Sequence, residues 1–258
     1  MNKLDEIVAW KKEELAQAKQ ERSVAQLERA LKQRLPLRNF REAIARPGSL
    51  SLIAEIKKAS PSAGPIRPSA DVLEIAKIYE TAGAQAISVL TDEKFFSGSL
   101  NDLAAVRGKV SLPVLRKDFL LEEYPVLEAA AAGADAVLLI AAILPPPVLK
   151  RLIRFAGELS LTALVEVHTE PELDAALEAE AQVIGVNNRD LGTLQVDLKI
   201  TERLFRRIPA GKVRVSESGL HSRADLEFVQ RQGAHAVLIG EELMSAADPA
   251  RRIRELLA

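Results

Sequence analysis

The sequence contains no cysteine. Disulfide bonds, thiolate metal sites and cysteine nucleophiles are therefore excluded, and the composition agrees with a reducing compartment such as the cytoplasm. Histidine is scarce as well: His168, His221 and His235 are far apart in the chain and lack the spacing of metal ligands. We therefore expect neither a metal site nor another cofactor.

The chain also lacks an excess of charge of either sign. It has 35 Lys and Arg residues and 36 Asp and Glu residues, which gives a net charge of -1. No general positive field is available to attract nucleic acid or an anionic membrane, although a local basic cluster could still hold one phosphate. Long apolar runs are missing, since none approaches the roughly 20 residues that cross a bilayer, and the charged N-terminus has no signal-peptide core. We expect a cytoplasmic protein that binds neither nucleic acid nor membranes.

Aromatic residues make up only 4% of the chain, so the core of this 258-residue protein must be aliphatic. From about Ser51 onward, short apolar runs alternate with amphipathic helical stretches, which is typical of βα units that feed a parallel sheet. The predicted strands are residues 52–57, 86–90, 114–117, 136–140, 162–167, 183–187, 213–217 and 236–240.

An internal repeat supports this alternation. The segments "AGAQAISVL", "AGADAVLLI" and "QGAHAVLIG" share one pattern of helix end followed by strand. Gly83 and Gly133 lie 50 residues apart and Gly233 lies 100 residues further on, so the period is two βα units. Eight such units match a single α/β domain of the (β/α)8 TIM-barrel type. A doubly wound open sheet is the alternative.

The first 48 residues lie outside the repeat and have helical periodicity. Ser23 is placed to cap a second helix, and Pro36 is placed to follow its end. We predict an N-terminal helical extension over residues 1–48, with two helices laid across one end of a barrel formed by residues 49–258. Trp10 is expected to anchor the first helix by packing rather than to contact a ligand.

Polar residues collect where the predicted strands end, and in this fold the active site lies at those carboxyl ends. Side chains alternate along a strand, so Glu55 and Lys57 should both point into the barrel mouth while Lys58 points away and supports the structure. Ion pairs that merely plug the barrel would explain one or two such strand ends. Polar groups stand at the ends of five strands, which favours a reaction site. Strand by strand, they are Glu55 and Lys57; Lys117; Glu166; Asn187 and Arg189; and Glu217 and Ser218.

The loops around this mouth indicate the kind of substrate. Gly219 and Gly240 precede the last helices of the barrel, where backbone N–H groups attract phosphate. Phe95, Phe96 and Phe119 fall near one rim and favour a flat apolar or aromatic group. The sequence therefore predicts a small phosphorylated substrate with an aromatic part.

These segments together resemble the indole-3-glycerol-phosphate synthase family, a barrel of tryptophan biosynthesis with an N-terminal helical extension. The resemblance spans nearly the whole chain and rests on six segments in order: "IAEIKKASPSAGPI", "LTDEKFFSGS", "LPVLRKDF", "ALVEVH", "IGVNNRDL" and "VSESGL". It implies decarboxylating ring closure and dehydration of 1-(2-carboxyphenylamino)-1-deoxyribulose 5-phosphate to indole-3-glycerol phosphate.

The resemblance also implies roles for the matched residues. Lys117 is similar to the family's general acid for ring closure, and Lys57 to the lysine that holds the substrate carboxylate. Glu166 is similar to the acid or base of dehydration, and Glu55 to a carboxylate that orients the lysines. Residues expected to contact the substrate are Asn187, Glu217, Ser218, Phe95, Phe119 and Arg189, and those expected at the phosphate are Gly219, Gly240 and Glu241.

Two expectations concern single groups in this site. A partly desolvated lysine beside other cations should have its pKa lowered, which would suit Lys117 as a proton donor. Glu241 places a carboxylate beside the expected phosphate, so only its backbone N–H should face the cavity, with the side chain turned away.

Two rival functions are considered. Phosphoribosylanthranilate isomerase, a sugar-phosphate barrel of the same pathway, relies on a catalytic cysteine that this chain lacks. A non-catalytic barrel that binds a phosphorylated metabolite, as a sensor or a subunit of a complex, would have no need for the set Lys57, Lys117 and Glu166. The sequence indicates a phosphorylated small-molecule substrate and identifies no protein partner.

Overall fold

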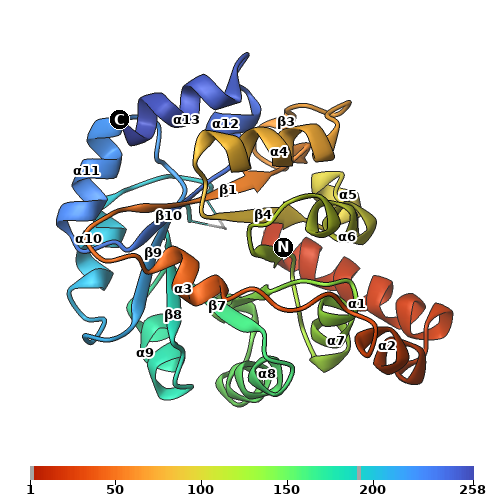
Figure 1. Cartoon of the computed structure of the whole chain (residues 1–258). Coiled ribbons are helices and arrows are strands. Elements are labelled where there is room, and N and C mark those ends of the chain that lie inside the picture. Colours follow the sequence, from red (N-terminus) through yellow and green to blue (C-terminus); the bar gives the residue numbers. More distant parts are fainter. Residues whose placement is uncertain (1–2, 191–192) are drawn as a thin grey trace.

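The computed structural model describes residues 3–190 and 193–258, and these contain a closed barrel of eight parallel strands with helices outside it (Figure 1). Around the barrel the order is β1, β4, β5, β6, β7, β8, β9 and β10, and β10 pairs with β1 to close it. The strands are β1 (Ser51–Ile56), β4 (Ala86–Leu90), β5 (Val114–Lys117), β6 (Ala136–Ile140), β7 (Thr162–Val167), β8 (Val183–Asn187), β9 (Val213–Glu217) and β10 (Ala236–Ile239). The predicted TIM barrel is confirmed, and each strand agrees with its prediction to within one residue at either end.

One longer helix follows each barrel strand and covers it from outside. These helices are α4 (Val72–Ala82), α6 (Leu100–Lys109), α7 (Glu123–Ala131), α8 (Pro146–Glu158), α9 (Glu170–Glu178), α10 (Lys199–Phe205), α11 (Arg223–Arg231) and α13 (Pro249–Leu257). Several begin at side-chain caps: Thr169 and Ser222 each form a capping box, and Asp71 caps α4. Gly83 ends α4 in the left-handed conformation, with φ 103°.

Short elements occupy the loops at the carboxyl ends of four strands. They are the hairpin of β2 (Ala59–Ser60) and β3 (Gly64–Pro65), the helix α5 (Glu93–Phe96), the 3-10 helix η1 (Ala141–Ile143) and the helix α12 (Glu241–Met244). The sequence did not predict them, because segments of two to four residues are too short to show a period.

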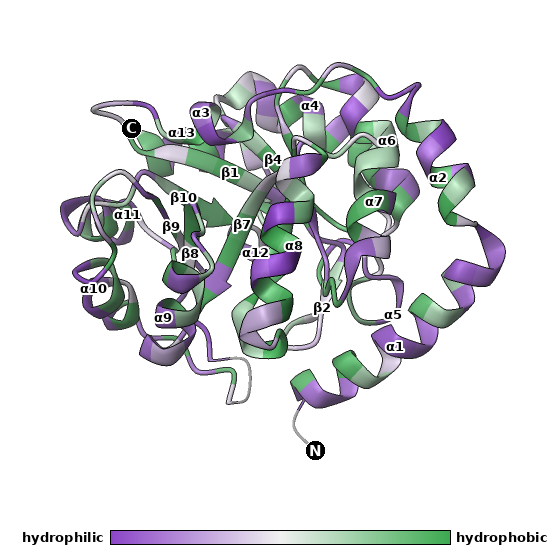
Figure 2. Cartoon of the chain, turned by 90° about the horizontal axis from the view of Figure 1, so that it is seen from below, coloured by the Kyte–Doolittle hydropathy of each residue, from purple (hydrophilic) through white to green (hydrophobic). Residues whose placement is uncertain are grey.

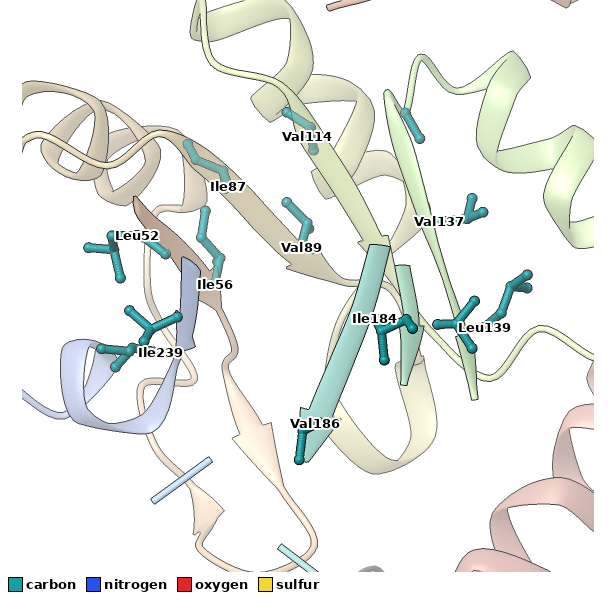
Figure 3. Close-up of a cluster of buried hydrophobic side chains, with 14 of the residues drawn as sticks. Leu52, Ile56, Ile87, Val89, Val114, Val137, Leu139, Ile184, Val186 and Ile239 are labelled. Carbon is teal, nitrogen blue, oxygen red and sulfur yellow. The ribbon is translucent and has the colours of Figure 1, made fainter. Parts of the chain in front are cut away.

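Two apolar layers follow from the alternation of side chains along the strands. Outward-facing residues pack beneath the helices, and among those labelled in Figure 3 are Leu52, Ile56, Ile87, Val89, Val114, Val137, Leu139, Ile184, Val186 and Ile239. Inward-facing residues fill the barrel itself, among them Ile53, Leu115, Leu164, Val183 and Val215. The central strands are accordingly mostly hydrophobic in Figure 2, while the surrounding helices show hydrophilic stretches.

The N-terminal helices reach both ends of the barrel. They are α1 (Lys3–Glu21), α2 (Val24–Leu31) and α3 (Phe40–Ile44). Phe40 and Ile44 of α3 are fully buried among residues at the amino ends of the strands and close that end. Helix α2 packs against α7, where Leu27 meets Tyr124 and Leu127 (Figure 1). The two predicted helices are present as α1 and α2, but α2 lies along α7 and not across one end of the barrel. The short α3 was not predicted, because its 5 residues are too few to show a period.

Trp10 attaches α1 to the short helix α5. The Nζ atom of Lys94 lies 3.5 Å from the centroid of the Trp10 ring, within the range of a cation–π contact. The role expected for Trp10, packing of the first helix, agrees with this contact. Within the part of the chain that the structure describes, no helix is long and apolar enough to cross a membrane.

Candidate active site

A cavity lies at the carboxyl ends of the barrel strands, with a volume of about 1180 Å³ that includes its open mouth. Twelve of the predicted site residues line it: Glu55, Lys57, Lys117, Phe119, Glu166, Asn187, Arg189, Glu217, Ser218, Gly219, Gly240 and Glu241. Closure of the barrel brings these residues together, because parallel strands end at the same edge. The structure does not place Phe95 in the wall of this cavity.

The first strand delivers an ion pair to the cavity. Lys57 Nζ lies 3.1 Å from Glu55 Oε1, and both side chains are largely buried. The next residue, Lys58, points to the opposite side and its Nζ donates a 2.7 Å hydrogen bond to Asp102 Oδ2 of α6. The two adjacent lysines are thus separated by strand alternation as the sequence predicts.

Across the cavity a second lysine faces two carboxyl groups. Lys117 Nζ at the end of β5 lies 3.4 Å from Glu166 Oε2 and 3.7 Å from Glu217 Oε2. Glu166 comes from β7 and Glu217 from β9, so these three groups meet from strands that are not adjacent. An ammonium group is therefore within reach of two carboxyl oxygens that belong to buried side chains.

The pKa of Lys117 is raised rather than lowered. Burial alone lowers it, but the surrounding carboxyl groups of Glu166, Glu217 and Glu55 outweigh that effect. The expectation of a lowered pKa is wrong, because it assumed cationic neighbours where the structure places carboxylates. Lys117 is consequently charged, with protons to donate.

Glu217, in contrast to the charged Lys117, favours its uncharged form. Burial, reinforced by the charge of Glu166 beside it, raises the pKa of Glu217 to about 8, although Lys117 pulls it downward. Among the residues that the structure describes, neither carboxyl oxygen of Glu217 has a hydrogen-bond partner. Burial and the neighbouring carboxylate therefore favour the protonated form of Glu217 at neutral pH.

Glu55 is buried as well, yet it is ionised. Burial raises its pKa, but the positive charges of Lys57 and Lys117 outweigh burial and lower it overall. The cavity therefore contains one carboxyl group that keeps its proton and one that gives it up. Carboxyl groups whose surroundings push their pKa values apart are a feature of acid–base sites.

The far side of the cavity is formed by the turns after β9 and β10. Ser218 and Gly219 both adopt positive φ, at 66° and 74°, and a Cβ on Gly219 would lie 2.3 Å from Val196 Cγ1. Glu241 pairs with Arg189: its Oε2 lies 3.9 Å from Arg189 Nη2, and both residues line the cavity.

The aromatic rim is formed by Phe96 and Phe119, whose ring centroids lie 6.0 Å apart. Phe95 instead contacts Lys3 and Lys94, with ammonium-to-centroid distances of 4.8 and 5.4 Å. Successive residues on a helix point about 100° apart, so neighbours on α5 cannot both face the cavity. The sequence could place the pair at the rim but could not tell which ring faces inward.

Comparisons with known proteins identify one family over nearly the whole chain. The family model described as "Indole-3-glycerol phosphate synthase" matches residues 4–256. The chain is 44% identical over 255 residues to the indole-3-glycerol phosphate synthase of Desulforamulus reducens, which covers 98% of this chain and 96% of that protein. It is 52% identical over 209 residues to that of Dehalococcoides mccartyi, which covers 80% of this chain and 81% of the relative. The chain belongs to the indole-3-glycerol phosphate synthase family.

Members of the indole-3-glycerol phosphate synthase family are decarboxylating, ring-closing lyases of tryptophan biosynthesis, and this chain is such a lyase. Among solved structures, it superimposes on the 3-hexulose-6-phosphate synthase from Salmonella typhimurium with a TM-score of 0.66, at 15% identity and with 80% of this chain and 96% of the other covered. At that identity the similarity supports the barrel fold alone.

The sequence did not predict that the first helix of this indole-3-glycerol phosphate synthase family member would border the site. Lys3, Leu4 and Ile7 of α1 line the cavity mouth. The spacing of Leu4 and Ile7 is a helical signal that was available, but it shows only that one face is apolar and not what covers it.

Also unpredicted is a buried charge cluster that joins α1 to the strand ends. Lys11 Nζ lies 2.8 Å from Asp118 Oδ1 and 3.4 Å from Asp92 Oδ2. Burial alone raises the pKa of Asp118, but the charges of Arg116 and Lys11 hold it at about 2. Asp118 directly follows Lys117, so the cluster lies immediately behind the active site.

Proposed function

We propose that this cavity converts 1-(2-carboxyphenylamino)-1-deoxyribulose 5-phosphate to indole-3-glycerol phosphate, CO2 and water, with the groups described above as its catalysts. One observation carries the proposal: Lys117 lies within 3.4 Å of Glu166 and 3.7 Å of Glu217, while Lys57 and Glu55 face them in the same cavity. Ring closure and dehydration require a proton donor together with one protonated and one ionised carboxyl group.

Lys117 is assigned to ring closure. The aromatic carbon that bears the carboxylate attacks the sugar carbonyl carbon, and negative charge develops on the carbonyl oxygen. The ammonium of Lys117 donates a proton to that oxygen, which becomes a hydroxyl group. Glu166 and Glu217 lie close enough to return a proton to Lys117.

Lys57 is assigned to the substrate carboxylate. Its ammonium projects into the cavity and is held by Glu55 at 3.1 Å. The electrons of the bond to the departing carboxylate return to the ring as CO2 leaves. An ammonium that positions the carboxylate before this step aligns it without any covalent intermediate.

Glu166 is assigned to dehydration, with Glu217 as its proton partner. The hydroxyl group formed in the first step leaves as water, which requires one proton at its oxygen and the removal of another from the ring system. Glu217, whose surroundings favour its protonated form, and Glu166 both adjoin Lys117 and can supply the two transfers.

The remaining residues are assigned to binding. Phe119 and Phe96 would border the aromatic ring, and Asn187 and Arg189 the sugar chain. The phosphate is assigned to the turns that contain Ser218, Gly219 and Gly240, with the backbone N–H of Glu241. We do not assign Phe95 to the substrate.

We expect Glu241→Ala to leave substrate affinity nearly unchanged, and a large change in KM would show that its carboxylate takes part.

The test is to supply the purified protein with the carboxyphenylamino deoxyribulose phosphate in the presence of EDTA and to follow indole fluorescence. We expect a rise in fluorescence without added metal or cofactor, and none from Glu166→Gln. Substrate binding by calorimetry without any fluorescence change would instead support a barrel that only binds the metabolite.

A further inference from the structure

Gly185 interrupts the wall of side chains that lines the barrel. It occupies an inward-facing position of β8, between Val183 and Asn187. In the sheet it pairs with Glu166 of β7 on one side and with Val215 of β9 on the other. Strand β8 thus has no side chain at the level where the carboxyl groups of β7 and β9 approach each other.

The space above Gly185 is filled by the carboxyl group of Glu217. A Cβ built on Gly185 would lie 2.2 Å from Glu217 Oε1 and 3.3 Å from Glu217 Cδ, as well as 3.2 Å from Leu164 Cδ1. The backbone of Gly185 is not in the left-handed region, so alanine could adopt its conformation. Space, and not backbone conformation, is what a larger residue would lack here.

We propose that Gly185 is a positioning residue: its missing side chain leaves the space in which Glu217 of β9 meets Glu166 of β7 across the intervening strand. The inference rests on the proposed function of that carboxyl pair. Pairing on both sides fixes the backbone of β8, so a Cβ at position 185 must displace the Glu217 carboxyl group instead.

Displacement of the Glu217 carboxyl group would change its distance from the charged groups around it. The titratable groups around it are Glu166 from β7, Lys117 from β5 and Glu55 from β1. Burial and the repulsion by Glu166 are the two largest effects on the Glu217 pKa, and both raise it. A Glu217 pushed outward loses part of both, so its pKa should fall.

The test compares Gly185→Ala with Gly157→Ala, a matched control in α8 where a Cβ has open space. The pKa of Glu217 is measured by NMR titration of the protein labelled with ¹³C at the glutamate carboxyl carbons. We expect the pKa in Gly185→Ala to be lower by about one unit, as for separated like charges, and unchanged in the control. The value of kcat should fall about tenfold or more, with a smaller effect on KM.

A second arm measures the melting temperature in a double-mutant cycle. Gly185→Ala should lower the Tm in the natural background but not in Glu217→Ala, where the clashing carboxyl group is absent. If Gly185→Ala alone does not fold, recovery of folding in the double variant supports the proposal and failure of both overturns it.

An equal loss of Tm in both backgrounds, or an unshifted Glu217 pKa in folded Gly185→Ala, would overturn the proposal. Neither measurement depends on turnover. Failure of the proposed reaction would appear only in the fluorescence assay, so the two failures are distinguishable.

Discussion

At the scale of single residues, Glu55 and Glu217 show how position decides chemistry. Both are glutamates at the ends of barrel strands, and both are nearly inaccessible to water. Glu55 has Lys57 at 3.1 Å and is ionised, whereas Glu217 has Glu166 beside it and Lys117 only at 3.7 Å, and keeps its proton. The difference comes from which charges surround each group, and it separates a charged orienting group from a proton-holding one.

This difference predicts a pH dependence of stability. The pKa of Glu217 is raised on folding to about 8, so its contribution to stability is present at low pH and is lost as the pH rises toward that value. Glu217→Gln is neutral at every pH. We therefore expect its Tm to match that of the natural protein near about pH 5 and to exceed it at about pH 8.5.

The matched control is Glu13→Gln, at an exposed position on α1. The Tm of Glu13→Gln should differ from that of the natural protein by the same amount at both pH values. If the Tm difference of Glu217→Gln did not grow between the two pH values, Glu217 would not hold its proton in the folded protein.

At the scale of elements, α1 does more than cover the barrel. It contributes Lys3, Leu4 and Ile7 to the cavity mouth and Lys11 to the buried cluster behind Lys117. The Lys11 side chain is 6% exposed, and its ammonium group has three carboxylate neighbours: Glu14, Asp92 and Asp118. Asp92 also caps α5, which carries Phe96. One lysine therefore ties the first helix to two loops of the active site.

Lys11→Met should destabilise the protein, because it leaves the Asp92 and Asp118 carboxylates buried with one partner fewer. Breaking a buried ion pair in this way costs about 3 kcal/mol, which chemical denaturation can measure. Lys12→Met, at the exposed neighbouring position, is the control and should cost little. Equal stability of the two variants would show that the cluster does not hold α1.

At the scale of the whole molecule, the barrel was predictable because each strand is a short apolar run and several covering helices begin at side-chain caps. Thr169 and Ser222 mark helix starts by side-chain chemistry that is visible in the sequence. Alternation also gave the inward direction of Glu55 and Lys57 correctly. These features are local, so a single sequence contains them.

Other features depended on contacts between distant segments. Strand alternation shows that Glu166 and Glu217 point inward, but not that they meet across Gly185, because that depends on the tilt and register of a closed barrel. The raised pKa of Lys117, the inward ring of Phe96 and the partner of Lys11 likewise follow from neighbours that lie far away in the chain.

The central claim is that Lys117 donates the proton for ring closure, and Lys117→Met tests it most directly. We expect kcat for the formation of indole-3-glycerol phosphate to fall by a factor of about 10² to 10⁴, with the Tm unchanged or raised because catalytic groups are commonly held in place at a cost in stability. Lys150→Met, at an exposed position on α8, should retain full activity. A Lys117→Met protein that keeps its kcat to within about twofold while losing thermal stability would contradict the account and make Lys117 a structural ion-pair residue.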